Sequence, residues 1–128
     1  MKVIIAGSRT IWSYKKVCKA ITFSGFNNTT VISGDAQGID KIAIIWALLN
    51  KRGLQKMKAD WKKFGKSAGM IRNNHMAKEA EALIAVWDGT SPGTKHMINL
   101  ARKLGLKVYV LIVRGSLHKP KTPGFIQI

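Results

Sequence analysis

The amino-acid sequence predicts an α/β fold, a single three-layer domain in which helices cover both faces of a mostly parallel sheet of about five strands. Short apolar runs alternate along the chain with segments of helical periodicity, as expected for successive strand–helix–strand units. The apolar runs are continuous rather than alternating, which is typical of parallel strands buried on both faces. A chain of 128 residues has room for one such domain and one core.

Five apolar or β-rich runs are the predicted strands. They cover residues 2–6, 30–33, 54–59, 82–87 and 107–113. The third run contains Lys56 and Lys58, which favour a strand at an exposed edge of the sheet.

The segments between these runs carry apolar residues at helical spacing. The predicted helices cover residues 12–23, 38–51, 70–81 and 94–104. Gly53 and Gly105 follow the second and the fourth of them, near the position where glycine commonly ends a helix. We expect the domain to span residues 1–115 and residues 116–128 to form a C-terminal tail.

The composition excludes several classes of protein. A hydrophobic fraction of 46% is normal for a globular chain and argues against disorder. No apolar run reaches the roughly 18 residues that a transmembrane helix requires, and the opening run is too short for a signal peptide. The single cysteine, Cys18, excludes an internal disulfide framework and a cysteine-rich zinc site. We therefore expect a cytoplasmic protein with no membrane association, metal or cofactor.

The charge of the chain is strongly positive. Lys and Arg number 22 against 6 acidic residues, which gives a formal net charge of +16. Such a surface attracts nucleic acid or small phosphorylated ligands. The basic residues are scattered along the chain, so two interpretations remain open: a solubilising surface with weak nonspecific affinity for nucleic acid, and a surface that serves a polyanionic partner.

The predicted helix 38–51 is apolar in almost every direction, and a helix of this kind must be buried on all sides. A domain of this size has little depth with which to cover an outer helix face. We therefore expect this helix to lie at the contact between subunits of a homo-oligomer. The alternative is that the C-terminal tail covers it.

Polar, glycine-containing turns follow three of the predicted strands, at the edge where parallel sheets bind ligands. Glycine lets a ligand approach the backbone, hydroxyl groups offer hydrogen bonds, and arginine pairs with phosphate. The turns therefore predict an anion-binding site made of three groups of residues: Gly7, Ser8 and Arg9; Ser33, Gly34 and Asp35; and Asp88, Gly89, Ser91, Gly93 and Thr94.

Five residues have a possible structural role, and all of them except Asp40 also have a possible binding role. Arg72 and Asn73, near a helix start, are candidates to hold a phosphate and a base or ribose edge, or else form a solvated first turn. Asp35 and Asp40 cap the following helix, unless Asp35 contacts a ribose hydroxyl. Trp61 is either a core residue or a surface on which a base stacks.

Several motifs occur in a distinctive order along residues 2–112. They are Gly7-Ser8-Arg9, Ser33-Gly34-x-Ala36-x-Gly38-x-Asp40, Ala59-Asp60-Trp61, Gly65-x-x-Ala68-Gly69-x-x-Arg72-Asn73-x-x-Met76 and Gly93-Thr94. This order resembles the YspA/YpsA-related branch of the SLOG superfamily. The resemblance implies a Rossmann-like domain that binds a nucleotide or nucleotide-derived small molecule at the C-terminal edge of the sheet, as a sensor or a sequestering protein.

The chain departs from that superfamily in two turns. It has Asp35 and Gln37 where the family usually has Gly and Arg, and no glutamate follows Gly93-Thr94, where the phosphoribohydrolase branch carries one. Cleavage of an N-glycosidic bond needs a carboxylate, so whether the protein is an enzyme stays open. The alternatives to simple binding are a nucleotide N-glycosidase or phosphoribohydrolase, and a nucleic-acid-binding protein similar to DprA.

Overall fold

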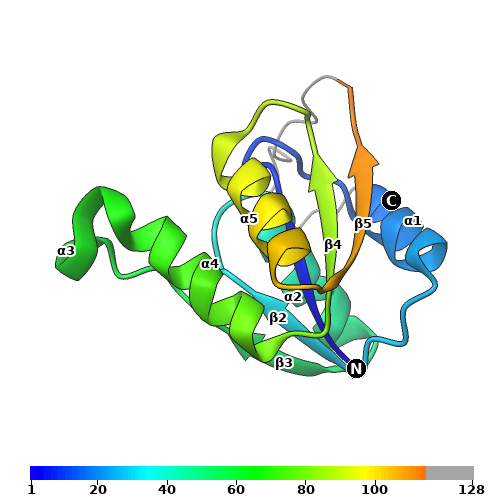
Figure 1. The fold of residues 1–128 in the computed structure, drawn as a ribbon. Helices are drawn as coiled ribbons and strands as arrows, with labels where there is room; N and C mark the ends of the chain where they lie inside the picture. The colour runs from blue at the N-terminus through cyan, green and yellow to red at the C-terminus, as the bar shows by residue number, and fades with distance from the viewer. Residues whose placement is uncertain (115–128) are drawn as a thin grey trace.

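The computed structural model describes residues 1–114, which form one five-stranded sheet (Figure 1). All four strand pairings are parallel, in the order β3-β2-β1-β4-β5. The strands are β1 (Lys2–Gly7), β2 (Thr30–Ser33), β3 (Gly53–Lys56), β4 (Ala82–Trp87) and β5 (Lys107–Ile112). The predicted α/β class and the parallel five-stranded sheet are confirmed.

Two helices pack on each face of the sheet. Helices α1 (Tyr14–Ser24) and α2 (Ile39–Leu49) cover one face, and α4 (Ala68–Glu79) and α5 (Pro92–Lys103) cover the other. Because successive strand residues point to opposite faces, Val3 joins the first core and Ile4 the second. Both faces of the central strands are therefore buried, which explains their unbroken apolar sequence.

The segment between β3 and α4 differs from the prediction. The third strand ends at Lys56 rather than at residue 59, and a short helix α3 (Trp61–Phe64) and a 3₁₀ turn η1 (Gly65–Ser67) follow. The side chain of Asp60 starts α3 by accepting a hydrogen bond from Lys63 N–H at 3.1 Å. This segment projects beyond the sheet (Figure 1), and its residues Trp61 and Lys66 line the site described below.

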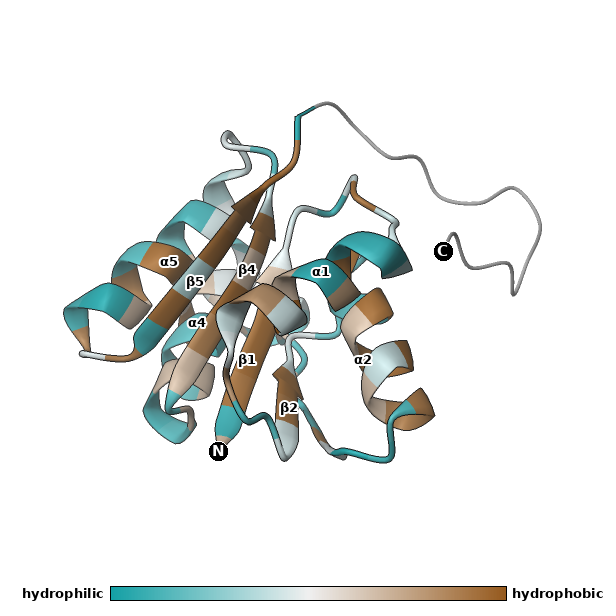
Figure 2. Ribbon diagram, turned by 90° about the vertical axis from the view of Figure 1, so that its right-hand side faces the viewer, coloured by the Kyte–Doolittle hydropathy of each residue, from teal (hydrophilic) through white to brown (hydrophobic). Residues whose placement is uncertain are grey.

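Helix α2 is only partly covered within the described chain. Its residues Ile42, Ala43 and Trp46 are buried, but Leu48 and Leu49 are 65% and 64% exposed, and the apolar colour continues to the end of the helix in Figure 2. The end of α2 therefore has an apolar surface that residues 1–114 leave uncovered. The tail that would be its alternative cover lies outside the described residues.

Two findings bear on the class of protein. No helix among residues 1–114 has the length and apolar character needed to cross a membrane. In the same part of the chain, no group of three or more His, Cys, Asp or Glu side chains is arranged to hold a metal ion.

Candidate functional site

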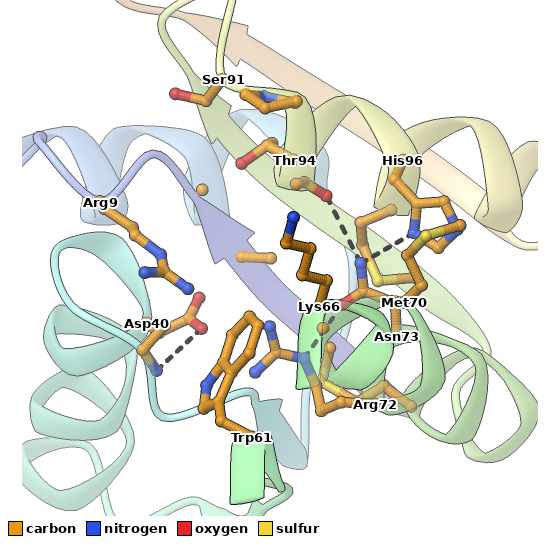
Figure 3. A pocket seen from close by; sticks show the side chains of 18 of the residues that line it. Arg9, Asp40, Trp61, Lys66, Met70, Arg72, Asn73, Ser91, Thr94 and His96 are labelled. Carbon is orange, nitrogen blue, oxygen red and sulfur yellow. Dashed lines mark hydrogen bonds between the residues drawn. The ribbon is translucent and has the colours of Figure 1, made fainter. Parts of the chain in front are cut away.

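A cavity of about 590 Å³ opens at the carboxyl edge of the sheet (Figure 3). The chain runs from β1 outward to β3 and then returns to β4 on the other side of β1, which makes this edge the switch point where such sheets bind ligands. The volume lies in the range of small-molecule sites. The lining residues are Ala6, Gly7, Arg9, Thr10, Ala36, Asp40, Trp61, Lys66, Gly69, Met70, Arg72, Asn73, Met76, Ser91, Pro92, Gly93, Thr94, His96 and Met97.

The turn after β1 is held against β4 and α2. A Cβ on Gly7 would lie 2.1 Å from Val86 O, so only glycine allows this strand to approach β4 so closely. The Ser8 hydroxyl accepts a hydrogen bond from Asp88 N–H at 3.0 Å, and the Ser8 side chain is fully buried. Ser8 therefore fixes the turn, while the exposed Arg9 reaches the cavity.

The turn after β2 is held from within in the same way. The Ser33 hydroxyl donates to Asp40 O at 3.0 Å and accepts from Asp35 N–H at 3.2 Å. Asp35 pairs with Lys41 at 2.5 Å, and this hydrogen bond lowers the pKa of Asp35. Gly34 and Asp35 line a smaller hollow of about 180 Å³ beside the main cavity.

Two polar residues of helix α4, Arg72 and Asn73, are held at the cavity wall by hydrogen bonds. Arg72 Nη1 donates to Gly34 O at 2.6 Å and Arg72 Nε donates to Asn73 Oδ1 at 3.0 Å. Asn73 Nδ2 lies 3.0 Å from His96 Nδ1; because an amide nitrogen only donates, this imidazole nitrogen is the acceptor. Arg72 and Asn73 thus tie together β2, α4 and α5, and both line the cavity.

The loop before α5 presents the start of that helix to the cavity. Asp88 Oδ1 accepts from Thr90 N–H at 2.8 Å and from Ser91 N–H at 2.7 Å. Burial opposes the charge of Asp88, but these backbone hydrogen bonds and the side-chain hydrogen bonds with Ser91 and Ser8 together outweigh burial and lower its pKa to about 2. The loop is therefore fixed by Asp88, and Gly93 and Thr94 reach the cavity from the first turn of α5.

Asp40 lines the cavity, whereas the sequence predicted only a capping role for it. It was predicted to cap the helix, but its Oδ2 accepts from Ala36 N–H at 3.1 Å, a group in the turn before α2. Only 4% of Asp40 is exposed, and burial raises the pKa of its carboxyl group to about 6, against the opposing effect of Arg72. A buried carboxylate with a raised pKa on a cavity wall marks a candidate functional group.

An apolar rim completes the cavity. Trp61 and Met70, although large, are 50% and 54% exposed, and the Arg9 guanidinium carbon lies 5.8 Å from the centre of the Trp61 ring. Figure 3 shows the Lys66 amino group pointing into the space that they surround. The sequence predicted Trp61 to be either a core residue or a stacking surface, whereas nothing in the sequence pointed to Lys66 or Met70.

The structure brings most of the predicted site residues together. Seven of them line the main cavity: Gly7, Arg9, Arg72, Asn73, Ser91, Gly93 and Thr94. Gly34 and Asp35 line the adjoining hollow. Neither hollow is lined by the other four, Ser8, Ser33, Asp88 and Gly89; the first three hold the turns through hydrogen bonds, and Gly89 is an exposed loop residue.

The fold is similar to that of DNA processing protein A (DprA) from Streptococcus pneumoniae, with a TM-score of 0.68 and 20% sequence identity. The match covers 85% of this chain and 49% of DprA, so the chain spans about half the length of that protein. This likeness confirms the Rossmann-like fold, whereas the SLOG superfamily and its YspA/YpsA branch stay predictions.

A comparison of the chain with models of protein families finds no match. The Gene 61 protein of Mycobacterium phage D29 is 33% identical over 119 residues, which cover 84% of this chain and 93% of the phage protein. The chain therefore belongs to the same family as the phage D29 Gene 61 protein.

Proposed function

We propose that the protein binds a nucleotide or nucleotide-derived small molecule, as a sensor or a sequestering protein of the YspA/YpsA-related branch. The observation that carries this proposal is the composition of the cavity: three cationic side chains (Arg9, Lys66 and Arg72), a helix start and an aromatic rim surround one open cavity at the switch point of the sheet. A cytoplasmic setting is part of this proposal.

The cationic side of the cavity suits a phosphate group. The first helical hydrogen bond of α5 runs from Lys95 N–H to Ser91 O, so the N–H groups of Gly93 and Thr94 precede it and are available to an anion. Arg9 and Lys66 bring two positive charges to the same space. Together these groups supply the donors and the charge that a phosphate requires.

The rim of the cavity suits an aromatic base. An exposed tryptophan is a large apolar surface that water solvates poorly, and the flat face of its ring stacks on any base. Trp61 and Met70 present such a surface beside the cationic groups. A ligand with a phosphate at one end and a base at the other matches both features.

Nucleotides are expected to raise the melting temperature of the protein. At a hundredfold excess over Kd, a ligand stabilises the folded state by about 2.7 kcal/mol, which corresponds to a shift of several degrees for a domain of this size. Thermal-shift measurements with mono-, di- and cyclic nucleotides and ADP-ribose test this. Arg9→Ala is expected to lose most of the shift, whereas Arg102→Ala, which removes the same charge from the last turn of α5, is expected to keep it.

No shift with any of these compounds at millimolar concentration would contradict the proposal. An equal loss of the thermal shift in both variants would show that nucleotide binding depends on the overall charge of the protein and not on the cavity.

Nucleic-acid binding is the second candidate, favoured by the charge of +16 and by the fold shared with a DNA processing protein. Since the basic residues are scattered, we expect weak, sequence-tolerant binding dominated by counterion release. Affinity for a single-stranded oligonucleotide, measured by fluorescence anisotropy, is expected to fall about a hundredfold or more between about 50 mM and 200 mM salt. Tight or sequence-selective binding at the higher salt concentration would favour this candidate over the first.

Hydrolysis of the bound nucleotide is the enzymatic alternative. No acidic residue follows Gly93-Thr94, but Asp40 places a carboxylate on the cavity wall, which is the group that a nucleotide N-glycosidase needs. Chromatography of a nucleotide that has been incubated with the protein distinguishes binding from hydrolysis. Intact ligand supports binding, and release of free base that Asp40→Asn abolishes would favour the enzyme.

Self-association through α2 is also part of the proposal. Two copies that bury the exposed apolar face of α2 against each other would give a particle of twice the 14.2 kDa chain mass. Light scattering is expected to show this dimer. Replacing both Ile45 and Leu48 with Glu is expected to dissociate it, because like charges would be buried at the contact. Leu104→Glu, an exposed apolar residue after α5, is the control; a monomeric wild type would contradict the proposal.

A further inference from the structure

The Asp40 carboxylate is buried but faces the cavity. It is the second residue of α2, 4% exposed, and its Oδ2 accepts from Ala36 N–H. Within residues 1–114, this is the one hydrogen bond that reaches the carboxylate, and no ion pair does. Figure 3 shows the group facing the same space as Arg9 and Trp61. The second oxygen, Oδ1, is therefore left for whatever fills the cavity.

The neighbouring residues make room for the Asp40 carboxylate, but within residues 1–114 none of them forms an ion pair with it. A Cβ on Gly34 would lie 2.9 Å from Asp40 Oδ2 and 2.3 Å from Arg72 Nη1, so the glycine makes the space in which both side chains lie. Arg72 is the cation that opposes the raised pKa of Asp40 most strongly, but its Nη1 and Nε donate to Gly34 O and Asn73 Oδ1. A ligand that fills the cavity displaces water from Asp40 Oδ1, so binding is unfavourable unless the ligand supplies a donor in its place.

The charge of the Asp40 carboxylate limits which hydrogen-bond donors of a ligand can lie beside it. An ionised carboxylate only accepts hydrogen bonds, and its charge repels a phosphate. The phosphate therefore belongs with Lys66 and the start of α5, and Arg9 adds its positive charge from the side of the cavity next to Asp40. The remaining donors of a nucleotide are its ribose hydroxyls and, in some bases, an exocyclic amine. The ribose joins the phosphate to the base, and Asp40 lines the cavity together with both the proposed phosphate site and the proposed base site.

We propose that Asp40 accepts hydrogen bonds from the ribose hydroxyls of the ligand, so that the cavity selects ribonucleotides over nucleotides whose sugar lacks these groups. This inference rests on the proposed nucleotide-binding function. It assigns Asp40 as the residue that determines specificity for the sugar.

Calorimetric titration with AMP, 2′,3′-dideoxy-AMP and IMP tests the inference. Wild-type protein is expected to bind AMP about 10- to 100-fold more tightly than the dideoxy form, because hydrogen bonds to a charged group are strong. IMP, which keeps the ribose but lacks the exocyclic amine, is expected to bind like AMP. Asp40→Ala is expected to bind all three alike, and Asp40→Asn serves as the conservative variant if the alanine variant folds poorly.

Glu79→Gln is the matched control, since it removes one negative charge from the far end of α4, and it is expected to keep the preference for AMP. Equal wild-type binding of AMP and dideoxy-AMP overturns the inference but leaves nucleotide binding intact. Weak binding of IMP that Asp40→Asn restores to the level of AMP would assign Asp40 to the base amine and also overturns it. Absence of binding by all three, with no thermal shift from any nucleotide, would contradict the proposed function itself.

Discussion

Asp40→Asn is expected to raise the free energy of unfolding at pH 8 by up to about 3 kcal/mol, although it alters a residue of the candidate site. The pKa of Asp40 is about 6 in the folded protein, against an ordinary value of 3.8. A shift of one pKa unit corresponds to about 1.4 kcal/mol, so keeping this buried group ionised at pH 8 costs stability. Asparagine keeps an oxygen that accepts from Ala36 N–H and carries no charge.

The effect should depend on pH with a defined sign. Because the folded pKa is raised, the folded protein binds the proton more tightly than the unfolded chain, and stability is lost as the pH rises from about 4 through 6. The variant should thus match the wild type near pH 4 and exceed it above pH 6. Urea unfolding at several pH values measures this difference. A less stable Asp40→Asn at pH 8 would contradict the assignment.

Gly38→Ala is expected to destabilise the protein by 3 kcal/mol or more and to abolish ligand binding. Gly38 has φ 73° and ψ −128°, a conformation open almost only to glycine. A Cβ there would lie 2.4 Å from Ser8 O and 2.6 Å from Arg9 O. Both contacts are with backbone atoms of the turn after β1, so relief of the clash would displace Arg9 from the cavity.

Gly89→Ala is the control that measures the cost of a positive φ without a steric clash. Gly89 has φ 87° with nothing within 4 Å of an added Cβ, so its replacement is expected to cost about 1–2 kcal/mol. Thermal unfolding of the two variants measures the difference. Similar losses in both would show that the packing of the turn after β1 against α2 is less tight than described.

The fold was predictable because its main determinants are local. Continuous apolar strands indicate burial on both faces, and the strand–helix alternation leaves few topologies. The short helix α3 was missed because its main local signal is one capping residue, Asp60. The strand before it ends at Lys56, although the apolar Met57 and Ala59 continue the pattern that had predicted a longer strand.

The site was predictable in part, because glycine-containing turns mark the edge of the sheet but not the direction of each side chain. Ser8, Ser33 and Asp88 are the same residue types that bind phosphate or ribose, yet here their side chains bond to backbone groups: Ser8 to the loop after β4, Ser33 to α2 and Asp88 to its own loop. Asp40 was interpreted as a cap because acidic residues are common at helix starts. Its role as a cavity residue depends on Gly34 and Arg72, which only the folded chain brings to it.

The most direct test of the proposed function is an NMR titration of ¹⁵N-labelled protein with AMP and with ADP-ribose. The proposal predicts that saturable shifts of backbone amide signals cluster at Arg9, Asp40, Trp61 and Thr94, around the cavity. Shifts spread over the lysine-rich surface and weakened by salt would instead indicate nonspecific attraction of an anion. That result, or no shifts at all, would contradict the assignment of the cavity as a nucleotide site.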